Sequence, residues 1–130
     1  MMVPFPIAFL MAVLASDIAW WHWSDPFWAR VSLWLAGGGA VAGVLAGMAG
    51  PAELLFVRDI RRRAAAWSHF VVAIMLLSVA VANWGLRVHD AEARILPWGI
   101  YLSALGAGLV AVAGWLGATL RFEPQGGLLQ

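Results

Sequence analysis

Residues 61–87 read RRRAAAWSHFVVAIMLLSVAVANWGLR, three arginines followed by an apolar run that carries no formal charge from Ala64 to Trp84. An α-helix needs about 20 apolar residues to cover about 30 Å of bilayer hydrocarbon. The run has that length, and its flanking arginines suit the polar surfaces of a membrane. This stretch therefore predicts a transmembrane helix over 64–84.

Three further apolar stretches of similar length complete the pattern, at 5–21, 29–48 and 96–118. The first lacks the basic start and cleavage site of a signal peptide, so we expect a retained helix. Asp25-Pro26 indicates a turn, and Gly50-Pro51 ends or kinks the second span, with 53–60 as its alternative continuation. Because little chain is left for connections, the sequence predicts one all-α domain over 1–130, an integral membrane four-helix up-down bundle.

The composition excludes several classes of protein. The chain is 63% hydrophobic and 12% charged, whereas a soluble domain has about 25% charged residues. A net charge of +1, from eight arginines and seven acidic residues, gives no broad basic surface for nucleic acid. The absence of cysteine excludes disulfides and thiolate metal sites. The main partner of this surface is therefore the lipid bilayer.

Arginines near the span ends predict the orientation, because positive loops tend to stay in the cytoplasm. The connection between the second and third spans has four arginines, at 58 and 61–63, and Arg121 follows the last span. The opposite side has Arg30, Arg87 and Arg94. We therefore expect both termini in the cytoplasm, with the first and third connections outside.

Tryptophans are concentrated near the predicted outer interface. An indole ring suits the headgroup zone because its apolar body and its N–H donor are both satisfied there. An interfacial belt is the simpler interpretation; the alternative is an aromatic surface that docks a periplasmic partner, a quinone or a pigment. The residues concerned are Trp20, Trp21, Trp23, Trp28, Trp84 and Trp98.

A ridge of small residues marks the second span. Gly39, Gly43 and Gly47 recur at four-residue intervals, which allows close approach of another backbone. The fourth span has a matching stripe that includes Ser103 and Ala107, so we expect these two helices to pack together. A seam with a second copy or with another protein is the alternative.

Charged residues inside apolar spans are costly. Asp17 lies near the outer end of the first span, and the antiparallel third span brings Asn83 and Arg87 to the same depth. An Asp17–Arg87 ion pair with Asn83 as a hydrogen-bonding neighbour would lower the insertion cost and fix two helices in register. The sequence predicts this structural role, with proton relay as the alternative.

His69 is the candidate cofactor residue, but its support is weak. It lies near the inner end of the third span, whereas His22 and His89 lie at the outer side, about 30 Å away along a helix. Haem b in a bundle needs axial ligands at matched depth. The sequence therefore predicts no particular cofactor or metal site. Since soluble-enzyme motifs are also missing, we expect no catalytic residues.

Short motifs spread over nearly the whole chain form a recognisable pattern, namely Phe5-Pro6-Ile7-Ala8, Asp17, Gly50, Glu53, Arg63, Ala65, His69, Asn83, Arg87 and Gly114-Trp115-Leu116-Gly117. In these motifs the chain resembles a family of small four-helix bacterial membrane proteins known only as a domain of unknown function. With the arginine distribution, the resemblance implies a multi-pass protein of the bacterial inner membrane. The family pattern implies a histidine before the Phe-Pro-Ile-Ala segment, where this chain has Pro4. A two-histidine site is therefore less credible here. The resemblance also implies an accessory role beside periplasmic dehydrogenases or other redox proteins.

These observations favour a non-catalytic accessory or anchoring subunit of an inner-membrane assembly. The alternative is an electron-transfer subunit that binds haem b or contacts quinone. A transporter has less support, because the central thirds of the spans are largely Ala, Gly, Val and Leu.

The orientation can be tested by labelling. Cysteines introduced into this cysteine-free chain at Arg62 and Glu92 should react with an impermeant maleimide from opposite sides, position 62 from the cytoplasm and position 92 from outside. Labelling from one side only would refute the four-span arrangement.

Overall fold

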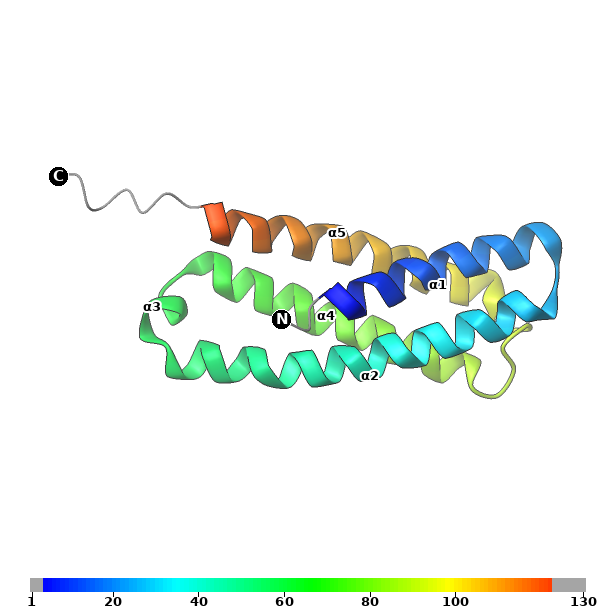
Figure 1. The fold of residues 1–130 in the computed structure, drawn as a ribbon, viewed down its shortest axis with the longest axis horizontal. Helices are drawn as coiled ribbons and strands as arrows, with labels where there is room; N and C mark the ends of the chain where they lie inside the picture. The colour runs from blue at the N-terminus through cyan, green and yellow to red at the C-terminus, as the bar shows by residue number, and fades with distance from the viewer. Residues whose placement is uncertain (1–3, 123–130) are drawn as a thin grey trace.

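The computed structural model describes residues 4–122, and all regular secondary structure in that range is helical (Figure 1). Four helices are long and two segments are short. The side chains of residues 4–6, 50, 53, 60, 117 and 119–122, which include Glu53 and Arg121, lie outside the described part. In chain order the elements are α1 (Pro4–Trp23), α2 (Pro26–Phe56), α3 (Arg58–Arg61), α4 (Ala64–Arg87), the helical turn η1 (Ile95–Gly99) and α5 (Ile100–Phe122).

Three segments within the described range are long and apolar enough to cross a membrane: Pro26–Phe56, Ala64–Arg87 and Ile95–Leu116. The apolar part of α1, Ile7–Trp23, is shorter. The all-helical class is therefore confirmed, and three of the four predicted spans reach membrane-crossing length.

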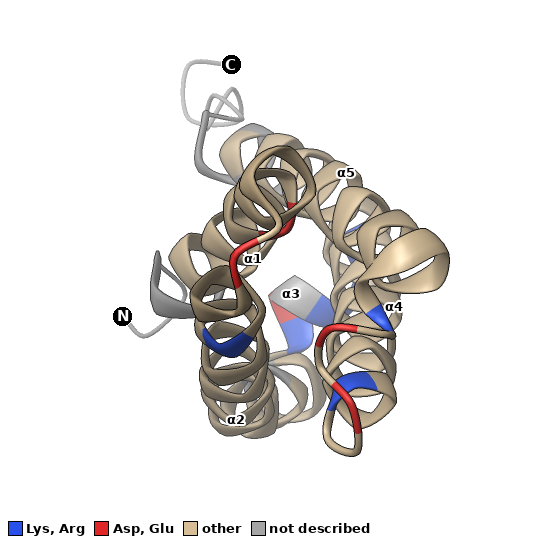
Figure 2. Cartoon of the chain, turned by 90° about the vertical axis from the view of Figure 1, so that its right-hand side faces the viewer, with Lys and Arg blue, Asp and Glu red and all other residues tan. Residues whose placement is uncertain are grey.

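The four long helices surround a common interior. Helix α1 packs against α2 and α5, and α4 packs against the same two helices, so an end-on view shows the four around one axis (Figure 2). Each helix contributes one residue to the central cluster, which consists of Leu10, Ala40, Ala80 and Val110. Two of the four are alanines, and such small side chains let helix backbones approach closely in a bilayer.

The turn between α1 and α2 follows from three consecutive residues. Ser24 adopts φ 52°, the left-handed conformation that ends many helices. The Asp25 carboxylate accepts a hydrogen bond from the backbone N–H of Phe27 at 2.9 Å. Pro26 occupies the first helical position, where its missing N–H costs nothing. The turn predicted from Asp25-Pro26 is confirmed.

Two predicted boundaries need correction. Helix α2 does not end at residue 48 but continues through Pro51 to Phe56. Proline affects mainly the turn before it, and the residues after Pro51 are good helix formers, of which Leu54 is buried. At the fourth span, Leu96 is extended (φ −108°, ψ 138°), as expected before Pro97. Regular helix therefore starts only at Ile100.

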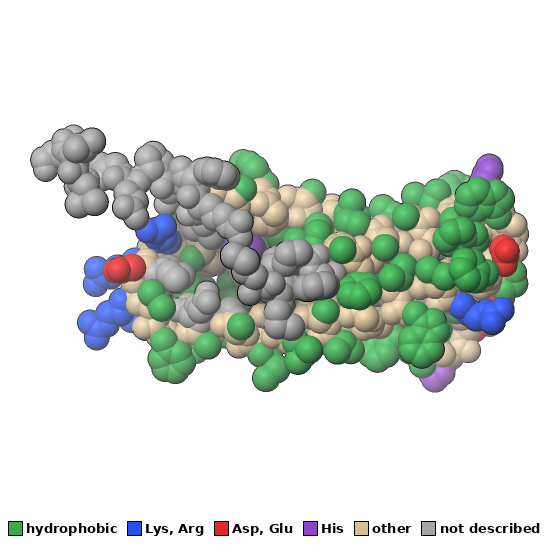
Figure 3. Space-filling view, viewed as in Figure 1, with side chains coloured by type: hydrophobic (Ala, Val, Ile, Leu, Met, Phe, Trp, Pro, Cys, Tyr) green, Lys and Arg blue, Asp and Glu red, His purple; other side chains and the backbone are tan. Residues whose placement is uncertain are grey.

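The outer surface of the bundle is apolar, as expected of a surface that contacts lipid. Hydrophobic side chains cover the length of the face shown in Figure 3, and charged side chains gather at its two ends. Large apolar side chains, such as Met11, Ile74 and Leu105, are about half exposed. A bundle with this surface belongs in hydrocarbon rather than in water.

The glycine ridge does not pack against the fourth span as predicted. A Cβ added at Gly39 would meet Phe9 and Leu10 of α1, whereas one added at Gly43 or Gly47 would meet Leu77 of α4. A step of four residues overshoots one helical turn by about 40°. The ridge therefore rotates around α2, away from the α1 side and toward α4.

This rotation predicts unequal tolerance along the ridge. Gly39→Leu should destabilise the bundle by about 1 to 3 kcal/mol, because Gly39 is buried and its added Cβ would lie 3.1 Å from the Phe9 Cβ. Gly47→Leu should be tolerated, because Gly47 is exposed and its nearest neighbour, a Leu77 methyl, is at 3.7 Å. Thermal unfolding in mild detergent measures both, and equal losses would contradict the rotation.

Candidate functional site

A fully buried ion pair joins α1 to the last turn of α4. The two terminal nitrogens of the Arg87 guanidinium donate to the two oxygens of Asp17, at 2.6 Å and 2.7 Å. Both side chains have 0% exposure. This two-pronged geometry is the strongest form of the carboxylate–arginine contact. Arg87 also carries its positive charge at the carboxyl end of a helix, where the helix dipole favours it.

Two serines complete the environment of the Asp17 carboxylate. The Ser32 hydroxyl of α2 lies 2.5 Å from one oxygen, and the Ser103 hydroxyl of α5 lies 2.5 Å from the other. With the two bonds from Arg87, the carboxylate accepts four hydrogen bonds, which matches its capacity of about four. A buried charge is tolerable when it is paired and hydrogen-bonded in this way.

Asn83 connects the remaining partners. Its side-chain oxygen accepts a hydrogen bond from the Arg87 Nε at 2.9 Å, one helical turn away. Its amide nitrogen donates to the Ser103 oxygen at 3.0 Å. The same Ser103 oxygen accepts from an Arg87 terminal nitrogen at 3.0 Å. All four long helices thus contribute to one hydrogen-bonded group, which we call the charge network (Asp17, Ser32, Asn83, Arg87 and Ser103).

A glycine makes room for the arginine. A Cβ added at Gly99 would lie 2.9 Å from an Arg87 terminal nitrogen and would collide with the backbone oxygen of Arg94. The Gly99 carbonyl is also 2.9 Å from the Ser103 hydroxyl. The turn η1 therefore closes the network at the start of α5, and a larger residue at position 99 would displace the Arg87 side chain.

The geometry of the charge network favours a structural role over a catalytic one. Every lone pair of the Asp17 carboxylate is occupied, so it has no free position for a substrate atom. Arg87 makes four hydrogen bonds within the network. Such a closed network holds four helices in one register.

The structure brings together the three polar residues predicted from the sequence, Asp17, Asn83 and Arg87. Sequence reasoning missed Ser32 altogether and gave Ser103 no part in the Asp17–Arg87 contact. The available signal was their depth, because both serines lie within predicted spans near the level of Asp17.

The histidines are separated. His22 and His89 are exposed, whereas His69 on α4 is half-buried. The buried Nδ1 of His69 has no hydrogen-bond partner among the described residues. Within the same range, no group of three or more His, Asp or Glu side chains is arranged to hold a metal ion.

The predicted tryptophan group is divided between exposed and half-buried positions. Trp21 and Trp23 are each 63% exposed and Trp98 is 65% exposed. Trp84 is exposed to a lesser degree, whereas Trp20 and Trp28 are half-buried. Trp23 stacks on Trp28 with ring centroids 5.8 Å apart, and Phe27 contacts Trp28 edge to face. An aromatic cluster therefore covers the turn between α1 and α2.

Comparison with known proteins identifies the family. The family described as a predicted membrane protein, DUF2231, matches residues 1–128, and the chain therefore belongs to that family of unknown function. No curated protein and no solved structure matches the chain.

The charge network can be tested by a double-mutant cycle. Asp17→Ala should lower the free energy of unfolding by about 3 to 5 kcal/mol, because it leaves Arg87 as an unpaired buried charge. Adding Arg87→Ala should recover part of that loss. Unfolding in detergent gives the coupling energy, with exposed Glu92→Ala as control, and additive losses would show that the two residues are not coupled.

Proposed function

We propose that this protein is a non-catalytic accessory or anchoring subunit of a bacterial inner-membrane assembly, of the redox or energy-transducing kind. The observation that carries this proposal is the set of large aromatic side chains left exposed at one end of the bundle. We call Trp21, Trp23, Phe27 and Trp98 the end-face aromatic surface. Each of these side chains is more than half exposed.

Such a surface suits a protein partner. Tryptophan is enriched among the residues that dominate binding energy at interfaces, because a rigid ring contributes a large contact area at low entropic cost. Here the rings are also held in place, since Trp23 stacks on Trp28 and the adjacent turn is capped by Asp25. A partner would meet a preorganised surface.

The charge distribution supports an orientation in which this surface faces the periplasm. Arg58, Arg61 and Arg62 are exposed around α3, at the end of the bundle opposite the α1–α2 turn (Figure 1). Arg87 is buried against Asp17, so it adds no exposed positive charge at the aromatic end. The positive-inside tendency then favours the proposed orientation, with α3 on the cytoplasmic side.

An electron-transfer subunit is the second candidate, favoured by the unpartnered Nδ1 of His69. Haem b in a bundle is usually held by two axial ligands on facing helices. The chain has three histidines, and the other two lie at the opposite end, so His69 alone would have to hold the iron. A Soret band in the purified protein would support this candidate over the anchoring role.

Affinity purification from native membranes in mild detergent tests the anchoring role. The wild-type protein should retain one partner at fixed stoichiometry, and a Trp21→Ala/Trp23→Ala variant should lose it by at least tenfold, since interface tryptophans commonly contribute about 2 kcal/mol or more each. Quantitative mass spectrometry of the eluate gives the ratio.

The matched control is Trp115→Ala, which removes an indole that is 67% exposed on α5, away from the end-face aromatic surface. It should leave the partner bound. If both folded variants retained the partner equally, the tryptophans would be explained as an interfacial belt alone. Recovery of a second copy alone would replace the accessory role with a homo-oligomer.

A further inference from the structure

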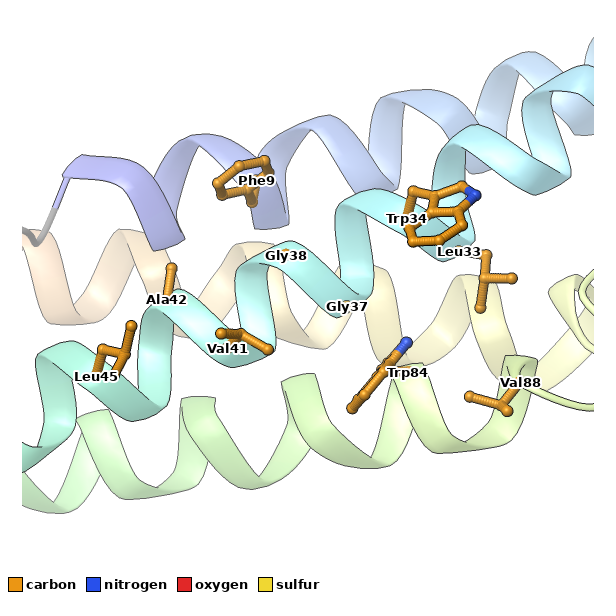
Figure 4. A pocket seen from close by; sticks show the side chains of 10 residues that line it. All are labelled: Phe9, Leu33, Trp34, Gly37, Gly38, Val41, Ala42, Leu45, Trp84 and Val88. Atoms are coloured by element: carbon orange, nitrogen blue, oxygen red, sulfur yellow. The ribbon is translucent and has the colours of Figure 1, made fainter.

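An apolar hollow of about 660 Å³ crosses the outer side of α2 (Figure 4). The backbone of Gly37 and Gly38 forms its floor, because glycine has no side chain. Phe9 of α1 borders it on one side and Trp84 of α4 on the other, and Trp34 stands at one end. From Trp34 the lining continues along α2 to Leu45.

The hollow is fixed by the packing of its walls. A Cβ added at Gly37 would collide with the Trp84 indole, 2.7 Å from its Nε1. A Cβ at Gly38 would lie 3.4 Å from the Phe9 ring. Both aromatic rings therefore rest against the glycine floor. In a bilayer, an apolar hollow of this kind is filled by hydrocarbon rather than by water.

A second hollow of about 460 Å³ adjoins the first at Trp34, which lines both. It contains the exposed Arg30, the fifth residue of α2. A residue so close to the end of a membrane-spanning helix is expected near the membrane interface. No ion pair or hydrogen bond joins the Arg30 side chain to another residue in the described range. Its positive charge is therefore available to an anion at the head of the apolar hollow.

We propose that the two hollows together bind one anionic phospholipid, with its phosphate on Arg30 and an acyl chain over Gly37 and Gly38. The dimensions agree with this ligand. Trp34 to Leu45 spans about 16 Å of helix, and one leaflet of hydrocarbon is about 15 Å thick. An acyl chain that starts beside Trp34, one helical turn further into α2 than Arg30, would end near Leu45.

The shape of the hollows favours a lipid over a protein helix. Trp34 is 79% exposed and stands where the hollows meet. A helix is about 10 Å across and would have to displace that indole to lie along both hollows. An acyl chain is thin and flexible, so it can pass beside the ring. A basic group near anionic headgroups adds the electrostatic attraction that a neutral lipid lacks.

Native mass spectrometry of the purified full chain, titrated with phosphatidylglycerol or phosphatidylcholine, tests the headgroup contact. The wild-type protein should bind one phosphatidylglycerol with about fivefold preference over phosphatidylcholine, which corresponds to about 1 kcal/mol for one arginine near the interface. Arg30→Gln should abolish the preference. Arg94→Gln, which removes an exposed arginine elsewhere, should keep it.

A second arm tests the chain contact. Ala42→Leu places bulk in the apolar hollow and should lower the binding of both lipids by at least fivefold without changing their ratio. Gly108→Leu places the same side chain on α5, where an added Cβ meets nothing within 4 Å, and should leave binding unchanged. Phosphatidylglycerol brominated in its acyl chain should also quench the wild-type fluorescence more than that of Trp34→Phe.

The proposal is overturned if the wild-type protein binds the two lipids equally or if Arg30→Gln behaves like Arg94→Gln. It is also overturned if Ala42→Leu binds as Gly108→Leu does, or if Trp34→Phe is quenched as strongly as the wild type. The proposal is also overturned if a second copy or another protein occupies the apolar hollow and is displaced from it by added lipid. The second hollow shares Phe27 with the end-face aromatic surface, so the titrations use the purified chain without a partner, and their outcomes are read separately from partner binding.

Discussion

A carboxylate and a guanidinium buried in the same bundle must stay in contact, because either charge left alone in hydrocarbon costs several kcal/mol. Asp17 lies on α1 and Arg87 on α4, and these helices occupy opposite corners of the bundle. Their contact draws α2 and α5 in as well, since Ser32 and Ser103 supply the hydrogen bonds that the carboxylate still needs. Depth, register and rotation of all four helices are thereby fixed at one end.

Packing in the rest of the bundle is of a different kind. Lipid tails are as apolar as leucine, so burial of apolar side chains adds little drive to helix association in a bilayer. The central residues are small, and Ala40 and Ala80 let the backbones come together. Glycines serve the same purpose, Gly39 against α1 and Gly99 beside the guanidinium. The charge network fixes how the four helices are aligned, and the small residues allow their backbones to approach closely.

The two ends of the molecule differ in chemistry, and the proposals follow from that difference. One end presents exposed indoles above a buried, saturated ion pair, and the other presents exposed arginines around α3. Between them, the face shown in Figure 3 is largely apolar, and the glycine-floored hollow lies on the outer side of α2. The proposed anchoring role rests on the aromatic end, and the proposed lipid site rests on the apolar hollow and on the exposed Arg30 beside it.

The sequence alone determined the helices and the Asp17–Arg87 contact, because hydropathy and depth along an antiparallel pair are one-dimensional properties. It could not decide which serines join that contact. A serine in a transmembrane helix can satisfy its hydroxyl on its own backbone, as Ser16, Ser68 and Ser78 do with the carbonyl four residues earlier. Only the rotation of each helix in the folded bundle turns Ser32 and Ser103 toward the carboxylate. The same rotation directs Gly39 to α1 and Gly43 to α4, since a residue's neighbours depend on three-dimensional packing that no spacing along one helix records.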